Sequence, residues 1–156
     1  MAKRTVVKKL PKVQDTRKVV INACFGGFGL SYKGLMAYAE KKGIHLYAFV
    51  DARKPEGHLD FDNHVPYHGE NEESFLFVHY ATSPLVNGKY KDKTYFSPSE
   101  IERDDPALVA VVEELGKEAC GWAADLRVVE IPADVVWEID EYDGQEHVQE
   151  QCRKWC

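Results

Sequence analysis

Residues 18–31, KVVINACFGGFGLS, carry the strongest fold signal in the chain. The first half of this stretch is β-branched and almost continuously apolar, as in a strand buried on both faces. Ser31 is placed to cap a helix that Gly43 can end, and residues 45–50 are again strand-like. A strand, helix and strand of this length are usually joined as a right-handed parallel crossover, so residues 18–51 predict a βαβ unit.

The rest of the chain supplies a second helix and further strands. Residues 52–74, rich in Pro, Gly and charge, predict a long loop, whereas residues 75–81 predict a strand and Asn87-Gly88 a turn. Residues 97–100 have the pattern of a short capped helix, and a longer helix should begin at Pro106. Residues 126–131 and 135–140 predict two closing strands before an acidic tail segment.

These elements define the expected fold class. We expect a single compact α/β domain over residues 18–156, with a mixed, mostly parallel sheet, a βαβ unit and two main helices. Residues 1–17 contain most of the basic residues near the N-terminus and predict a basic arm or an edge strand. We find no internal repeat and no linker that would justify a second domain.

Composition limits the classes of function. No apolar run approaches the ~20 residues of a membrane helix, and the interrupted N-terminus does not match a signal peptide. A net charge of −6 argues against a nucleic-acid partner. The cysteines lack CxxC spacing, which favours reduced thiols and a cytoplasmic location. They are Cys24, Cys120, Cys152 and Cys156.

The glycine-rich turn after the first strand is the main candidate site. Three glycines in four residues let backbone N–H groups approach a bound atom, and the following helix N-terminus favours an anion. The turn matches neither a Walker A motif nor a GxGxxG fingerprint, and tight helix-strand packing remains the alternative explanation. The candidate ligand-binding residues are Phe25, Gly26, Gly27, Phe28, Gly29, Leu30 and Ser31.

Four further ligand-binding candidates follow the second and third predicted strands. Ligands of parallel sheets bind beyond the carboxyl ends of the strands, which selects Asp51, Arg53, Thr82 and Ser83. Asp51 is suited to accept a hydrogen bond from a ribose hydroxyl, and Arg53 is suited to pair with a phosphate. The alternative for each is a solvated loop residue.

Other chemistries have weaker signals. His58, His64 and His68 lie in one acidic loop, but their spacing matches no zinc pattern. Cys24 with His79 offers a nucleophile and a base, although cysteine is also a common buried apolar residue. A carboxylate pair is available among Glu138, Asp140 and Glu141. We therefore assign no catalytic residue, no metal ligand and no cofactor.

Three stretches carry a resemblance to a known family: residues 19–31 (VVINACFGGFGLS), 126–132 (LRVVEIP) and 137–148 (WEIDEYDGQEHV). Together they resemble a family of small proteins encoded by tailed bacteriophages. The resemblance implies a viral protein of the bacterial host cytoplasm. It also implies a role similar to that of sponges, which sequester nucleotide signals of host immunity.

The expected function is the binding of a phosphorylated, nucleotide-derived small molecule, without turnover. One alternative is a small enzyme that hydrolyses or modifies a nucleotide or sugar. Another is an interaction protein that inhibits a host factor through its acidic surface. By analogy with sequestering proteins, whose pockets often form between subunits, we expect a homo-oligomer.

Overall fold

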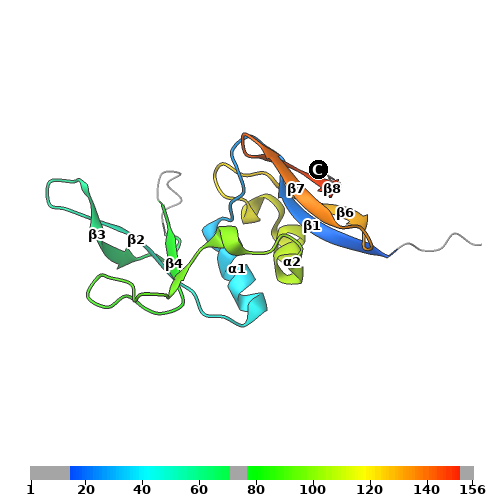
Figure 1. Ribbon diagram of the computed structural model, residues 1–156. Coiled ribbons are helices and arrows are strands. Elements are labelled where there is room, and N and C mark those ends of the chain that lie inside the picture. The colour runs from blue at the N-terminus through cyan, green and yellow to red at the C-terminus, as the bar shows by residue number, and fades with distance from the viewer. Residues whose placement is uncertain (1–14, 71–76, 152–156) are drawn as a thin grey trace, which may run out of the picture.

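The computed structural model describes residues 15–70 and 77–151. Within these residues, eight strands form three sheets in which every strand pairing is antiparallel, and two α-helices lie between the sheets (Figure 1). The prediction of a mostly parallel sheet is therefore wrong. Residues 1–14 of the predicted basic arm, and residues 75 and 76 of a predicted strand, lie outside the described residues.

Strand β1 (Thr16–Asn22) forms the centre of one end of the molecule. It pairs with β6 (Leu126–Pro132) along its whole length, from Thr16 opposite Pro132 to Asn22 opposite Leu126. Val19 and Val20 are fully buried, as the apolar run at this position predicts. Both predicted strands are confirmed. However, β1 pairs with β6, whereas the sequence predicted that it lies in one sheet with the strand of residues 45–50.

Two helices fill the middle of the molecule. Helix α1 (Tyr32–Lys42) is capped by Ser31, whose side chain accepts a hydrogen bond from the Gly34 amide, and it ends at Gly43, whose φ is 67°. Helix α2 (Pro106–Leu115) is capped by Asp105, and a single-turn helix η2 (Gly116–Ala119) follows it. The predicted helix starts are confirmed because capping chemistry is local. No helix in the described parts of the chain is long and apolar enough to cross a membrane.

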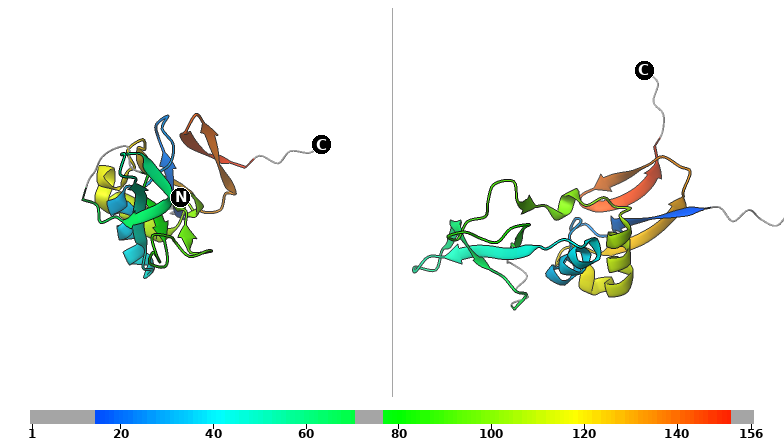
Figure 2. Two further views of the ribbon diagram at one scale, coloured as in Figure 1. Left: turned by 90° about the vertical axis from the view of Figure 1, so that its left-hand side faces the viewer. Right: turned by 90° about the horizontal axis from the view of Figure 1, so that it is seen from below.

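A four-stranded sheet forms the other end. Its order is β3 (Leu59–Pro66), β2 (Tyr47–Arg53), β4 (His79–Ala81) and β5 (Tyr95–Phe96), and a single-turn helix η1 (Pro98–Glu100) follows β5. β2 has β3 on one side and β4 on the other, so it has no edge left for β1. Helix α1 therefore carries the chain from one sheet to a different one, as the two further views show (Figure 2). The βαβ prediction is wrong for this reason.

Two segments predicted to be irregular are strands. β3 lies inside the predicted loop of residues 52–74, where a turn around Gly57 returns the chain beside β2. β8 (Gln145–Glu150) replaces the predicted acidic tail and pairs with β7 (Trp137–Tyr142). Asp143 and Gly144 form the turn between them with φ values of 50° and 85°, which is typical of a two-residue hairpin loop.

A buried polar network joins this hairpin to β1. The Asn22 side chain is fully buried, and its amide nitrogen Nδ2 donates to the carbonyls of Cys24 and Gly144, both at 2.7 Å. The Asn22 backbone N–H donates to Glu146 Oε2 at 2.8 Å. Arg103 binds the same carboxylate through two hydrogen bonds of 2.8 Å. Every charged member of the network thus has a partner of opposite charge.

Glu146→Gln should lower the free energy of unfolding by about 2 to 3 kcal/mol, because Arg103 would lose its counter-charge in a largely buried position. Urea denaturation followed by circular dichroism measures the change. Glu150→Gln is the matched control, since Glu150 is exposed at the end of the same strand and should change the free energy by less than about 0.5 kcal/mol. Equal effects of the two substitutions would contradict the role given to the network.

Candidate functional site

The glycine-rich turn packs closely against two other turns of the chain. We call this place the three-turn junction; it comprises residues 23–29, 120–125 and 140–145. A Cβ atom on Gly26 would lie 1.7 Å from the Ala123 carbonyl oxygen, and one on Gly144 would lie 2.6 Å from the Gly27 nitrogen. The Gly121 N–H donates to the Gly29 carbonyl at 2.8 Å. Small residues are needed here because backbone meets backbone.

The helix N-terminus beside this turn already has partners within the chain. The Ser31 backbone N–H donates to the Ala119 carbonyl at 2.9 Å, and the Ser31 hydroxyl donates to the Glu118 carbonyl. Phe25 is 63% exposed, and the Cα atoms of Gly27 and Gly29 face open space. Ligand binding by residues 25–31 stays a prediction, whereas Gly26 has a clear structural role.

Gly26→Ala should lower the free energy of unfolding by about 2 kcal/mol or more, because its methyl group would overlap the carbonyl of Ala123. Gly29→Ala is the internal control. Its methyl group meets nothing within 4 Å, so this variant should retain wild-type stability within about 0.5 kcal/mol. Thermal melting of both variants tests the packing role, which a stable Gly26→Ala protein would exclude.

The other predicted ligand-binding residues lie on the four-stranded sheet. Asp51 and Arg53 end β2, and Thr82 and Ser83 follow β4. Because β2 and β4 are antiparallel, with Tyr47 opposite Ala81 and Phe49 opposite His79, Thr82 and Ser83 lie at the opposite end of β2 from Asp51. The parallel strands from which these four residues were selected are therefore absent from the described residues, and Asp51 does not share an end of the sheet with Thr82 and Ser83.

Asp51 instead meets two histidines on one face of this sheet, which we call the histidine face. It comprises Phe49, Asp51, His64 and His79. Asp51 Oδ1 lies 3.8 Å from His64 Nδ1 and 3.5 Å from His79 Nε2, and the imidazole rings lie nearly parallel with their centroids 5.6 Å apart. Both of these nitrogens are buried without a hydrogen-bond partner among the described residues. Phe49 is fully buried and stacks on both rings.

A loop of residues 82–94 covers the histidine face. The Thr82 N–H donates to the Thr94 carbonyl, which closes the loop at its base, and the His64 N–H donates to the Gly88 carbonyl, both at 2.8 Å. Asn87 and Gly88 have φ values of 51° and 72°, so the predicted turn is confirmed. The ring of Tyr90 lies 5.7 Å from those of Phe49 and His64.

Burial is the main electrostatic influence on His64. It lowers the pKa of His64 below its ordinary value of 6.5, because a charged imidazole is poorly solvated there, and the neighbouring His79 acts in the same direction. The Asp51 carboxylate acts in the opposite direction. The face therefore places two imidazole rings around one carboxylate oxygen, partly closed to water.

Lowering the pH from about 7.5 to about 5.5 should lower the melting temperature, because the unfolded chain then takes up a proton at His64 more readily than the folded chain. The stability from neutral His64 is present above its ordinary pKa and is lost as the pH falls toward the lowered value. His64→Gln should reduce this decrease, whereas His58→Gln, at an exposed position in the β2–β3 turn, should leave it unchanged. Identical pH profiles for wild type and His64→Gln would contradict the role of burial.

The structure separates the members of the competing sites. His58 and His68 lie at the two ends of β3 and outside the histidine face, and no group of three or more His, Cys, Asp or Glu among the described residues could hold a metal ion. Cys24 lies in the turn after β1, whereas His79 begins β4 in the four-stranded sheet, and Cys24 Sγ donates to the Ala123 carbonyl. Glu138 and Glu141 accept hydrogen bonds within their own hairpin.

The surface beside Tyr90 was not singled out from the sequence. Residues 89–96, KYKDKTYF, alternate lysine with aromatic and other residues. This interleaving is itself a recognisable signal of binding to phosphorylated aromatic ligands, and the net negative charge of the whole chain masks it.

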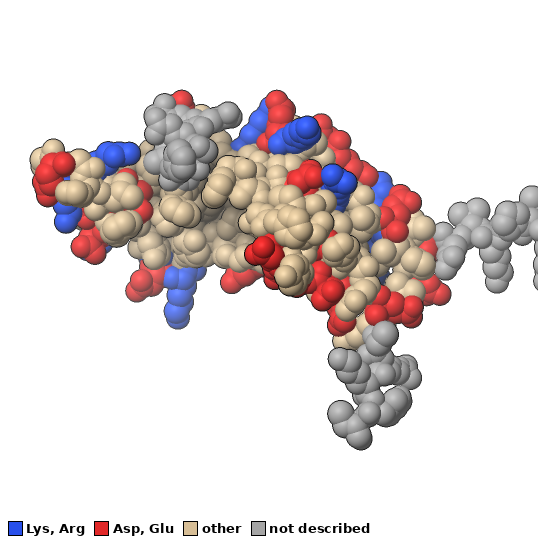
Figure 3. Space-filling model, turned by 90° about the horizontal axis from the view of Figure 1, so that it is seen from above, with Lys and Arg blue, Asp and Glu red and all other residues tan. Residues whose placement is uncertain are grey.

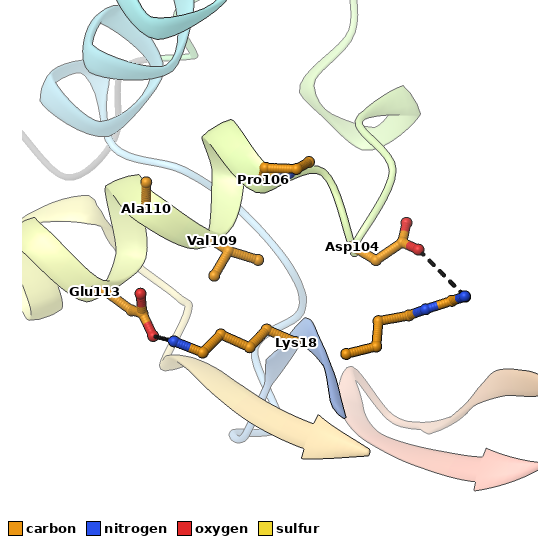
Figure 4. Close-up of a pocket in the computed structure, with 7 residues that line it drawn as sticks. Lys18, Asp104, Pro106, Val109, Ala110 and Glu113 are labelled. Carbon is orange, nitrogen blue, oxygen red and sulfur yellow. Dashed lines mark hydrogen bonds and ion pairs between the residues drawn. The ribbon is translucent and has the colours of Figure 1, made fainter. Parts of the chain in front are cut away.

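A shallow groove of about 320 Å³ lies between β1 and α2 (Figure 4). Its floor contains Val109 and Ala110, and its rim holds two ion pairs, Lys18 with Glu113 at 2.5 Å and Arg17 with Asp104 at 3.6 Å. Because each rim charge already has a partner, the groove presents little net charge to a ligand.

Comparisons with known proteins add no assignment: no protein family, no curated protein and no solved structure matches this chain. The candidate site therefore depends on its own geometry.

Proposed function

We propose that this protein binds a phosphorylated, nucleotide-derived ligand on the tyrosine-lysine segment, residues 89–95, beside the histidine face. The observation that carries the proposal is the combination of half-exposed rings and unpaired ammonium groups on this segment. Tyr90 is 42% exposed and Tyr95 is 51% exposed, and their centroids lie 5.9 Å apart. The location differs from the glycine-rich turn, whereas the class of ligand is the one expected from the sequence.

Tyrosine rings supply the stacking surface. An exposed aromatic face binds a nucleobase in a sequence-tolerant way, worth about 1 to 3 kcal/mol per base. Tyr90 packs on the buried Phe49, so its ring is held in position before a ligand arrives. Tyr95 is held beside it by its pairing with Ala81 in β4. The ligand therefore meets a preformed platform.

Lysine side chains supply the charge for a phosphate. Lys89, Lys91 and Lys93 are exposed, and none of them forms an ion pair with any described residue. Asp92 is the only acidic residue between them in the sequence. Three cations beside two rings match a ligand that has both a base and one or more phosphates.

Binding without turnover is the interpretation we favour for this surface. His64 Nδ1 and His79 Nε2 are buried from solvent, which keeps these two nitrogens away from a reacting group at the surface. The second candidate is a small enzyme acting on such a nucleotide. It is favoured by the short separation of both imidazoles from Asp51 and by the 30% exposure of the His79 side chain.

The resemblance to bacteriophage proteins supports a biological setting for the proposal. Sequestration of a host nucleotide signal requires a tight binding surface and no chemistry. An inhibitor of a host factor remains the alternative from another class, and it would need no nucleotide.

The test uses the full chain and a panel of cyclic nucleotides and ADP-ribose-like compounds. At about 100 times Kd, a ligand should stabilise the protein by about 2.7 kcal/mol, measured as a shift of the melting temperature. Recovery of the intact ligand after denaturation indicates a binder, and recovery of an altered compound indicates an enzyme.

Variants locate the site. Tyr90→Leu keeps an apolar side chain over Phe49 but removes the flat ring, and it should weaken binding about tenfold. Replacing Lys89, Lys91 and Lys93 together by Gln should weaken binding further and remove most of its salt dependence. Lys117→Gln is the control, since Lys117 is exposed on η2, away from the site. Absence of any nucleotide-induced shift, or a shift that these variants leave unchanged, would overturn the proposal.

A further inference from the structure

Three large aromatic side chains are exposed at the three-turn junction. Phe25 is 63% exposed, Trp122 is 79% exposed and Tyr142 is 77% exposed. Each belongs to a different one of the three turns, although they are far apart in the sequence. Exposed Trp and Tyr are enriched at the energetic centres of protein interfaces, because a flat amphipathic ring buries much area with few rotatable bonds.

The turns that carry these rings are fixed to one another. The Ala23 N–H donates to the Asp125 carbonyl and the Gly121 N–H donates to the Gly29 carbonyl, both at 2.8 Å. The close approaches of Gly26 to Ala123 and of Gly144 to Gly27 leave little room for relative movement. The rings are thus presented on a rigid base, which reduces the entropy lost on binding.

The junction is acidic. Its residue ranges 23–29, 120–125 and 140–145 contain Asp125, Asp140, Glu141 and Asp143 but no Lys or Arg. Arg127 pairs with Asp125 at 2.8 Å, and the other three carboxylates form no ion pair with a described residue. In the view from above, red side chains outnumber blue ones over the part of the molecule that carries β7 and β8 (Figure 3).

Aromatic rings among unpaired carboxylates favour a guanidinium group. One such arrangement lies directly beneath the junction, where the Arg103 guanidinium lies 3.5 Å from the centroid of the Phe28 ring and binds Glu146 through both of its terminal nitrogens. The exposed rings and carboxylates of the junction are the same two kinds of group at the surface, where the guanidinium has to come from a partner.

We propose that the three-turn junction is a docking surface for an arginine-rich, positively charged segment of a partner protein, with Trp122 and Tyr142 as its aromatic contacts. This surface is formed by the turn before α1, the turn after η2 and the β7–β8 turn, near the middle of the molecule (Figure 1), and it shares no residue with the tyrosine-lysine segment. The inference is therefore independent of the proposed nucleotide binding.

Fluorescence anisotropy with the full chain tests the proposal. The probe is a labelled peptide of about twelve residues in which Arg alternates with Gly, and peptides with Lys or Glu in place of Arg serve for comparison. The Arg peptide should bind with a micromolar Kd, the Lys peptide more weakly and the Glu peptide not at all. Raising the salt concentration from about 50 to about 200 mM should weaken binding several-fold.

Trp122→Ala and Tyr142→Ala should each weaken binding of the Arg peptide at least fivefold, and Asp143→Asn should weaken it by a smaller factor. Their high exposure means that the two aromatic substitutions should not alter the melting temperature. Val136→Ala is the matched control, an apolar residue that is 65% exposed outside the junction.

Equal affinity in the Trp122→Ala and Val136→Ala proteins, or equal binding of the Arg and Glu peptides, would overturn the proposal. Light scattering of the full chain provides a further test. Self-association that Trp122→Ala removes would show that the occupant is a second copy of this chain, and would overturn the assignment to a different protein.

Discussion

The carboxylate of Glu146 is the interaction on which one half of the molecule depends. It accepts hydrogen bonds from the Asn22 backbone and from Arg103, and Asn22 in turn binds the carbonyl of Gly144. Three segments far apart in the sequence are thereby fixed at the end of β1. Charges in a low-dielectric interior tolerate few alternative arrangements, because any shift leaves one of them without its counter-charge. The β7–β8 hairpin and the turn after β1 therefore have one way to pack.

Local features of this fold could be predicted from the sequence, whereas the strand pairing could not. Ser31, Gly43 and the Asp105-Pro106 pair determine helix ends through contacts within a few residues, and the helices begin where these signals place them. The strand with which a given strand pairs depends instead on segments that are distant in the sequence. The apolar run in β1 fits a buried strand in any sheet, so the usual crossover rule selected β2, although β6 occupies that position. The alternation of β3 and β8 is weak because both have largely exposed faces.

The candidate site likewise combines features that could be predicted from local sequence with contacts that could not. Asp51 could be selected from its position after a strand, but its neighbours could not, since His64 and His79 reach it only through antiparallel register. The glycines of the turn have a pattern that anion-binding loops and tightly packed turns share. Only the position of Ala123, almost 100 residues away, distinguishes the two for Gly26. The lysines near Tyr90 were hidden within an acidic total, because net charge averages over surfaces that act separately.

The presence of two oppositely charged surfaces on one chain has a consequence for assembly. The tyrosine-lysine segment belongs to the four-stranded sheet, whereas the acidic three-turn junction is formed by turns next to β1, η2 and the β7–β8 hairpin, so the two surfaces have no residue in common. Their opposite charges make them complementary between copies. At high concentration the tyrosine-lysine segment of one molecule should face the junction of another, and ionic strength should set how long such associations persist.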